Sequence, residues 1–216
     1  DSDLIRSTFT VGQAIDRIRQ EDIPDTTKRE LVDRTMRAVG KAALEGQVSY
    51  GVFATVEEAA RTFYLGFYIG TTPKIVSFPQ HAHYEIAPIG IENANRNLAA
   101  PYWEERIRSR INEEAQAFQV QAQGREPVVV SVAFGGNEPA LLLSGMLGAS
   151  VVHIIPVERT KNHWDARFLG EDPSIINGRS CFVVDDMVRS GRTLQAVRAV
   201  IDTNFAPADK RIVIIA

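Results

Sequence analysis

The sequence contains a single cysteine, Cys181, and no apolar stretch long enough to cross a bilayer. A lone cysteine cannot form a disulfide within the chain, and its position inside an apolar run is typical of a small buried core residue. A transmembrane helix needs about 20 consecutive apolar residues. No secretory signal or lipidation motif is visible. We therefore expect a protein of the reducing cytoplasm with no membrane partner.

Basic residues are also too few to attract nucleic acid. The 24 Lys and Arg are outnumbered by 27 Asp and Glu, which gives a formal net charge of −3. A chain without a basic field is a poor partner for DNA or RNA. Repeats and low-complexity tracts are absent. Since the chain starts at Asp1 without a methionine and stops at Ala216 within an apolar run, we expect the natural protein to extend further.

The most informative segment begins at Cys181. Residues 181–184 form an apolar run without alternation, which predicts a strand covered on both faces. Asp185 and Asp186 follow directly, so they lie where a parallel sheet meets its ligand crevice. Carboxylates at this position can hold the hydroxyls of a ribose.

A short glycine-containing turn and a helix follow the two acids. The turn comprises Arg189, Ser190, Gly191, Arg192 and Thr193. Its backbone N–H groups, together with the two hydroxyls, are placed to bind an anion at the N-terminus of the next helix. That helix is predicted from Leu194 onward by apolar residues at three- and four-residue spacing. A phosphate group fits this arrangement.

A second strand, loop and helix lie about fifty residues upstream. Residues 127–134 predict a strand, Gly135, Gly136 and Asn137 a loop, and Pro139 the first turn of a helix that ends at Gly148. The paired glycines allow a close approach of the backbone to a ligand. Taken alone, this glycine loop is equally compatible with an ordinary strand-to-helix turn.

The remaining pattern predicts an α/β fold in two regions. Strands at 150–157 and 211–216 join the two above in a parallel, twisted sheet flanked by helices, which we assign to residues 125–216. Residues 158–179 are expected to form an irregular, mobile loop. Residues 1–124 are expected to be mostly helical, with helices at 11–19, 26–44, 56–68 and 101–121 and a short strand at 74–78.

The two motifs resemble the core of the type I phosphoribosyltransferases, which binds 5-phosphoribosyl pyrophosphate (PRPP). The signature of that family is a run of aliphatic residues, two acids, and then a Thr or Ser, a Gly and a Thr, and residues 181–193 match nearly every position. Phe134 departs from the basic residue that usually precedes the paired glycines. The resemblance assigns the ribose hydroxyls to Asp185 and Asp186, the 5′-phosphate to Arg189, Ser190, Gly191, Arg192 and Thr193, and pyrophosphate to Gly135, Gly136, Asn137, Arg159 and Lys161. For Arg159 and Lys161, solvated charges on a surface loop are the alternative.

The resemblance implies an enzyme that transfers the phosphoribosyl group from PRPP to a nitrogen nucleophile, such as a base, and releases pyrophosphate. It also implies Mg²⁺, held through PRPP, water and the carboxylates of Asp185 and Asp186, and a homodimer. A non-catalytic PRPP or nucleotide sensor on the same fold is the alternative. A third hypothesis makes the N-terminal helices an interaction module carried by the core.

The acceptor is not predicted by the sequence. In the resembled family a variable hood covers the acceptor, and only residues 1–124 are available to form one. This region contains His81 and His83, which alternation would place on one face of a strand beside Glu85. Metal binding, contact with an acceptor or partner, and a structural role all remain open for this pair.

Overall fold

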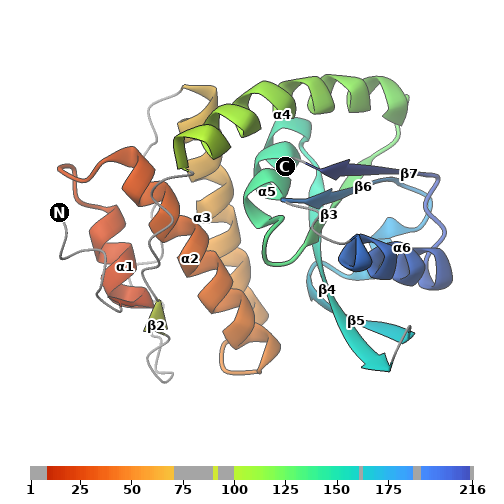
Figure 1. The fold of residues 1–216 in the computed structure, drawn as a ribbon, viewed down its shortest axis with the longest axis horizontal. Helices are drawn as coiled ribbons and strands as arrows, with labels where there is room; N and C mark the ends of the chain where they lie inside the picture. Colours follow the sequence, from red (N-terminus) through yellow and green to blue (C-terminus); the bar gives the residue numbers. More distant parts are fainter. Residues whose placement is uncertain (1–8, 71–89, 92–99, 161–162, 187–190, 215–216) are drawn as a thin grey trace. The chain divides into compact units, whose positions relative to one another are not determined.

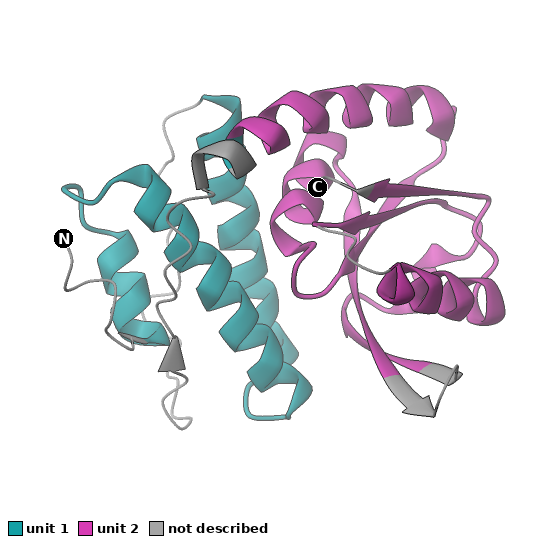
Figure 2. Cartoon of the chain, in the orientation of Figure 1, with its two compact units in different colours: residues 1–104 teal, residues 105–216 magenta. Residues whose placement is uncertain are grey.

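The computed structural model describes residues 9–70, 90–91, 100–160, 163–186 and 191–214. The chain divides into two compact units, residues 1–104 and residues 105–216 (Figure 2). In the described ranges, no helix is both long enough and apolar enough to span a membrane.

The first unit is a small helical assembly. Its helices are α1 (Val11–Ile18), α2 (Asp25–Leu44) and α3 (Tyr50–Ile69), and its two short strands, β1 (Phe9–Thr10) and β2 (Gly90–Ile91), pair antiparallel. Helix α2 packs against both α1 and α3. The predicted helices are confirmed, although α3 begins six residues earlier than the expected 56–68. Ser49 caps α3 by accepting a hydrogen bond from the N–H of Val52.

The second unit is a five-stranded sheet flanked by helices. The strand order is β5-β4-β3-β6-β7, with parallel pairing throughout except between β4 and β5, which are antiparallel. The predicted, mostly parallel α/β core is thereby confirmed. Its elements are α4 (Ala100–Ala122, which begins in the first unit), β3 (Pro127–Val132), α5 (Asn137–Leu147), β4 (Ser150–Thr160), β5 (His163–Gly170), β6 (Ser180–Asp185), α6 (Arg192–Asn204) and β7 (Asp209–Ile214).

The expectation of an irregular loop over residues 158–179 is wrong. Strand β4 continues to Thr160, β5 returns antiparallel beside it, and a 3₁₀ helix spans Pro173–Ile176. The alternation of polar Asp165 and Arg167 with apolar Ala166 and Phe168 is the signal of this strand. Ala166 and Phe168 pack against the hydrophobic core, so pairing and burial together hold the segment as an edge strand.

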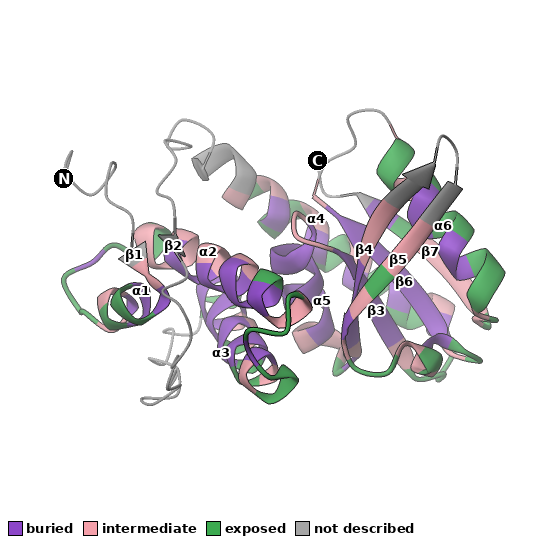
Figure 3. Ribbon diagram, turned by 90° about the horizontal axis from the view of Figure 1, so that it is seen from below, coloured by how far each residue is buried: buried purple, intermediate pink, exposed green. Residues whose placement is uncertain are grey.

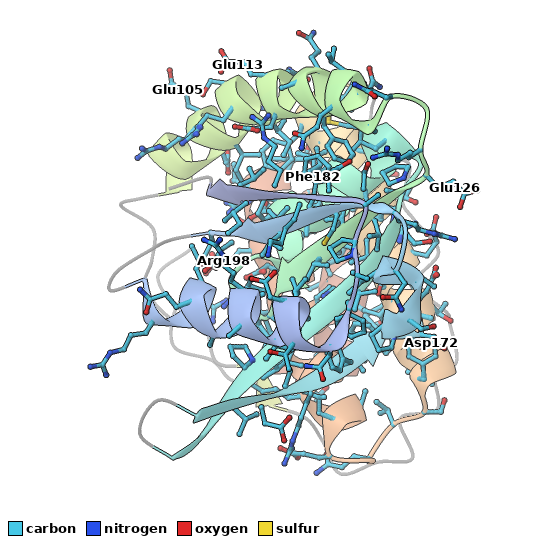
Figure 4. All side chains as sticks on the ribbon, turned by 90° about the vertical axis from the view of Figure 1, so that its right-hand side faces the viewer. Glu105, Glu113, Glu126, Asp172, Phe182 and Arg198 are labelled. Atoms are coloured by element: carbon cyan, nitrogen blue, oxygen red, sulfur yellow. The ribbon has the colours of Figure 1, made fainter. Side chains whose placement is uncertain are left out.

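The sheet is covered on both faces (Figure 1). Successive side chains of a strand point to opposite faces, so each central strand contributes to two cores. On one face, Val130 and Val183 pack with Val197 and Ile201 of α6. On the other face, α5 packs against β3, β4 and β6. The ring of Phe182, labelled in Figure 4, lies on this face, and it contacts the ring of Phe118 of α4. Figure 3 shows the resulting burial of β3 and β6.

The strand order places a ligand crevice between β3 and β6. The chain leaves β3 through α5 to reach β4 on one side, and it leaves β6 through α6 to reach β7 on the other side. Adjacent parallel strands whose connections run in opposite directions define a topological switch point. In open α/β sheets, ligands bind outside the carboxyl ends of the strands at this point. The loops after β3 and β6 therefore flank the expected binding crevice.

Candidate active site

The glycine loop follows β3 and leads directly into α5. The N–H of Gly136 donates to the carbonyl of Val132 at 2.9 Å, and the carbonyl of Gly136 accepts from the N–H of Ala140 at 3.0 Å. The Ala133–Phe134 peptide bond just before the glycines is cis. Helix α5 ends at Gly148, which adopts the left-handed conformation with φ 62°. The predicted order of strand, glycine loop and helix is confirmed.

The two acids follow β6. Asp185 is the last residue of the strand, and it is buried, with 5% of its surface exposed. Its Oδ1 accepts a hydrogen bond from the backbone N–H of Asp186 at 2.9 Å. Asp186 itself is only half-buried. Of the two carboxylates, that of Asp186 is therefore the more accessible to a ligand in the crevice.

The glycine loop and the acidic motif lie in direct contact. A Cβ placed on Gly135 would lie 2.6 Å from Cγ and 2.8 Å from Oδ2 of Asp186, and closer still to Oδ1. A Cβ on Gly136 would lie 3.1 Å from the carbonyl oxygen of Val132 and would overlap that of Val184. Gly136 has φ −75°, which any residue adopts. The requirement for glycine at these positions is thus one of space, because the loop backbone lies against β6 and its acids.

Helix α6 begins at the other end of the acidic motif. Gly191 has φ 71° and ψ −7°, and its carbonyl accepts from the N–H of Gln195 at 2.9 Å. Arg192 and Thr193 form the exposed first turn of the helix. Positive φ favours glycine strongly over residues with a Cβ. The predicted sharp turn into a helix is therefore present at Gly191.

Several residues that the sequence suggested lie outside the described residues. These are His81, His83, Lys161, Arg189 and Ser190. Arg159 lies near the end of β4, where only the backbone is described. The structure brings Gly135 against the carboxylate of Asp186, and Gly136 against the backbone of Val184 and Val132.

The donor set at the crevice suits a metal ion that carries most of its own ligands. Among the described residues, no group of three or more His, Cys, Asp or Glu side chains is placed to hold a metal. Mg²⁺ typically keeps several waters and is bound by one or two carboxylates together with substrate phosphate oxygens. Asp185 and Asp186 provide two carboxylates of this kind at the carboxyl end of β6.

Cys181 does not contribute a nucleophile. It is completely buried in β6, and this burial raises the pKa of its thiol to about 12, an effect that nearby Asp209 adds to and Lys210 opposes. A thiol is a nucleophile only as its thiolate. Cys181 is therefore a neutral core residue, as the sequence indicates.

One polar cluster beneath the glycine loop was not predicted from the sequence. Ser131 of β3 and His153 of β4 both lie against the side chain of Asn137, the first residue of α5. The available signal was a single polar residue within each of two otherwise apolar strand patterns, 127–132 and 151–157. Asn137 was predicted only as a residue of the pyrophosphate loop.

The second unit is an α/β sheet in which a glycine loop and a pair of acids meet at the topological switch point. The family model described as "Phosphoribosyl transferase domain" matches residues 104–215. The chain therefore belongs to the phosphoribosyltransferase family, which is a family of enzymes. No curated protein sequence matches the chain.

Solved structures of this family resemble about half of the chain. A purine phosphoribosyltransferase from Pyrococcus horikoshii is 20% identical over 50% of this chain and 70% of its own, with a TM-score of 0.39. A hypoxanthine phosphoribosyltransferase from Staphylococcus aureus is 16% identical over 51% of this chain and 62% of its own, with a TM-score of 0.43. A hypoxanthine-guanine phosphoribosyltransferase from Bacillus anthracis is 22% identical over 51% of this chain and 65% of its own, with a TM-score of 0.42. The matches thus span less than two thirds of the last two proteins.

Proposed function

We propose that this protein transfers the 5-phosphoribosyl group of PRPP to a nitrogen nucleophile of a base or a related small molecule and releases pyrophosphate. The observation that carries this proposal is the contact between Gly135 and the carboxylate of Asp186 at the switch point of the sheet. The contact brings together a loop suited to pyrophosphate and an acid suited to ribose hydroxyls. PRPP contains both groups on one sugar.

In this proposal the ribose lies against the acids. Asp186, which is half-buried, accepts hydrogen bonds from the ribose 2′ and 3′ hydroxyls, and Asp185 holds the turn through the N–H of its neighbour. The glycine loop binds the pyrophosphate through backbone N–H groups at the start of α5. The bond from the anomeric carbon to the pyrophosphate oxygen breaks, and a bond from this carbon to the acceptor nitrogen forms.

The 5′-phosphate lies at the start of α6. Arg189, Ser190, Gly191, Arg192 and Thr193 supply backbone N–H groups, hydroxyls and positive charge there, and the aligned peptide dipoles of the helix favour an anion at its N-terminus. Mg²⁺ held with PRPP by water and the carboxylates of Asp185 and Asp186 would supply positive charge against the leaving pyrophosphate. Arg159 and Lys161 extend the pyrophosphate site from the end of β4.

In this proposal, residues 1–124 supply the contacts that recognise the acceptor. A homodimer is expected from the family resemblance. These two assignments rest on the resemblance rather than on contacts within the chain.

The direct test is pyrophosphate release from PRPP in the presence of a panel of acceptors, starting with hypoxanthine, guanine and other purine and pyrimidine bases. We expect release to require one acceptor, to stop when Mg²⁺ is chelated, and to fall by at least 100-fold in the Asp186→Asn variant. Replacement of exposed Val120 by Ser, in α4, is a control that should leave the rate unchanged. PRPP binding without release for any acceptor would favour the sensor alternative.

A further inference from the structure

Three buried polar side chains form a cluster directly beneath the glycine loop. Asn137 is 1% exposed, Ser131 is 0% exposed and His153 is 1% exposed. The hydroxyl of Ser131 donates to Oδ1 of Asn137 at 2.9 Å, and Nδ1 of His153 lies 3.1 Å from the same oxygen. Ser131 and His153 are directly opposite each other in the register of β3 and β4. Two neighbouring strands thus hold one side chain of α5.

The chemistry of the amide defines the direction of these bonds. A carboxamide oxygen only accepts hydrogen bonds, so His153 donates from Nδ1 and carries its proton there. The amide nitrogen of Asn137 is buried and has no hydrogen-bond partner among the described residues. Among the described residues, Ser131 and His153 hold the Asn137 side chain, and both bond to its oxygen, Oδ1.

The imidazole of His153 is enclosed by backbone on its other side. Gly170 ends β5 beside it, and a Cβ at that position would lie 3.4 Å from Cδ2 of the ring. The backbone N–H of Ala133 also bonds to the carbonyl of Ile154, the residue after His153. The middle of β4 is therefore tied to the two ends of the glycine loop, by a main-chain hydrogen bond to Ala133 and a side-chain hydrogen bond to Asn137.

The position of Asn137 gives the cluster its importance. Asn137 directly follows Gly136, so an anchor on its side chain fixes the C-terminal end of the loop as it enters α5. The N-terminal end of the loop is fixed by β3 itself. We propose that His153 and Ser131 are positioning residues that hold the glycine loop, through Asn137, in the conformation that binds pyrophosphate. This inference rests on the proposed function of the site.

The two parts of PRPP can test this role separately, because the loop contacts pyrophosphate whereas the 5′-phosphate and ribose lie against the acids and α6. The experiment measures calorimetric binding of three ligands to the whole chain: magnesium PRPP, magnesium pyrophosphate and ribose 5-phosphate. The variant His153→Leu removes the donor and keeps a side chain of similar size. The variant His153→Asn retains an N–H close to the position of Nδ1.

We expect His153→Leu to lower the affinity for magnesium pyrophosphate about tenfold, which corresponds to ~1.4 kcal/mol of binding free energy. The affinity for ribose 5-phosphate should stay within about twofold of wild type. His153→Asn should restore pyrophosphate affinity to within about threefold. Ile154→Val is the matched control, since Ile154 adjoins His153 on β4 but packs on the α6 face. It should lower the melting temperature without changing the affinity for either ligand.

A purely structural role for His153 predicts a different result: the affinities for pyrophosphate and ribose 5-phosphate fall together, or neither affinity changes. Either outcome would overturn the inference. If His153→Leu does not fold, Ser131→Ala removes the second donor by deleting one oxygen, and the same selective loss is expected. A wild-type chain that binds none of the three ligands would overturn the proposed function and this inference with it. A wild-type chain that binds PRPP, with variants that bind pyrophosphate normally, would overturn only the inference.

Discussion

Replacement of the two loop glycines by alanine should separate ligand binding from folding. In Gly135→Ala the new methyl group meets the carboxylate of Asp186, with contacts of 2.6 and 2.8 Å to Cγ and Oδ2. This carboxylate is the end of a half-buried side chain, so it can rotate away. In Gly136→Ala the new methyl group meets the carbonyl oxygens of Val132 and Val184, which belong to paired strands and cannot rotate.

These contacts lead to opposite expectations for the two variants. Overpacking against fixed atoms costs about 1–3 kcal/mol, and a change of 1 kcal/mol moves the melting temperature by roughly 2–4 °C for a chain of this size. Gly136→Ala should therefore melt several degrees below wild type. Gly135→Ala should melt close to wild type but lose the contact of Asp186 with ribose. A hydrogen bond to a charged group is worth about 1.5–3 kcal/mol. The affinity of the Gly135→Ala variant for magnesium PRPP should therefore fall by about tenfold to a hundredfold.

Thermal unfolding and calorimetric titration of PRPP measure the two effects independently. Gly51→Ala is the control, because a Cβ at exposed Gly51 lies an ordinary 3.8 Å from the hydroxyl of Ser49. Unchanged PRPP affinity in Gly135→Ala would refute the claim that the position of Asp186 governs ribose binding. Equal losses of melting temperature in the two loop variants would refute the distinction between movable and fixed neighbours.

Three further predictions follow from single positions. Cys181, whose thiol pKa is raised to about 12 by burial, should not react with a disulfide reagent at pH 8 in the native protein and should react fully in denaturant; reaction in the folded state would contradict its burial. Gly191→Ala should destabilise the protein by about 1–2 kcal/mol because φ is 71°, and Gly191→Asn should cost less because asparagine tolerates the left-handed region; equal unfolding free energies would contradict this. Nitrogen NMR should find a proton on Nδ1 of His153, whereas an unprotonated Nδ1 would reverse its hydrogen bond with Asn137.

Much of the second unit is predictable from the sequence. The apolar runs at 127–132 and 181–184 lack alternation because both faces of their strands are covered, and this pattern identifies central parallel strands. Glycines at helix ends are equally informative, since Gly148 and Gly191 both adopt positive φ. The antiparallel strand β5 was missed because its charged residues outweighed the alternation of its apolar ones.

The contacts that make the site could not be predicted from local pattern. The close approach of Gly135 to Asp186 depends on the adjacency of β3 and β6, which are separated in the chain by β4 and β5. The cluster beneath the loop likewise depends on register, because only the pairing of Ser131 with His153 brings both to Asn137. The sequence motifs predicted the glycine loop and the acidic pair separately, and the strand order brings the two together.

The most direct test of the account is calorimetric titration of PRPP with Mg²⁺ into the wild-type chain and into a variant that carries both Asp185→Asn and Asp186→Asn. This measurement needs no knowledge of the acceptor. The account predicts micromolar binding to the wild type and its loss in a variant that keeps its fold by circular dichroism. Absence of binding to the wild type, or equal binding to both proteins, would contradict the assignment of the crevice between β3 and β6 as a PRPP site.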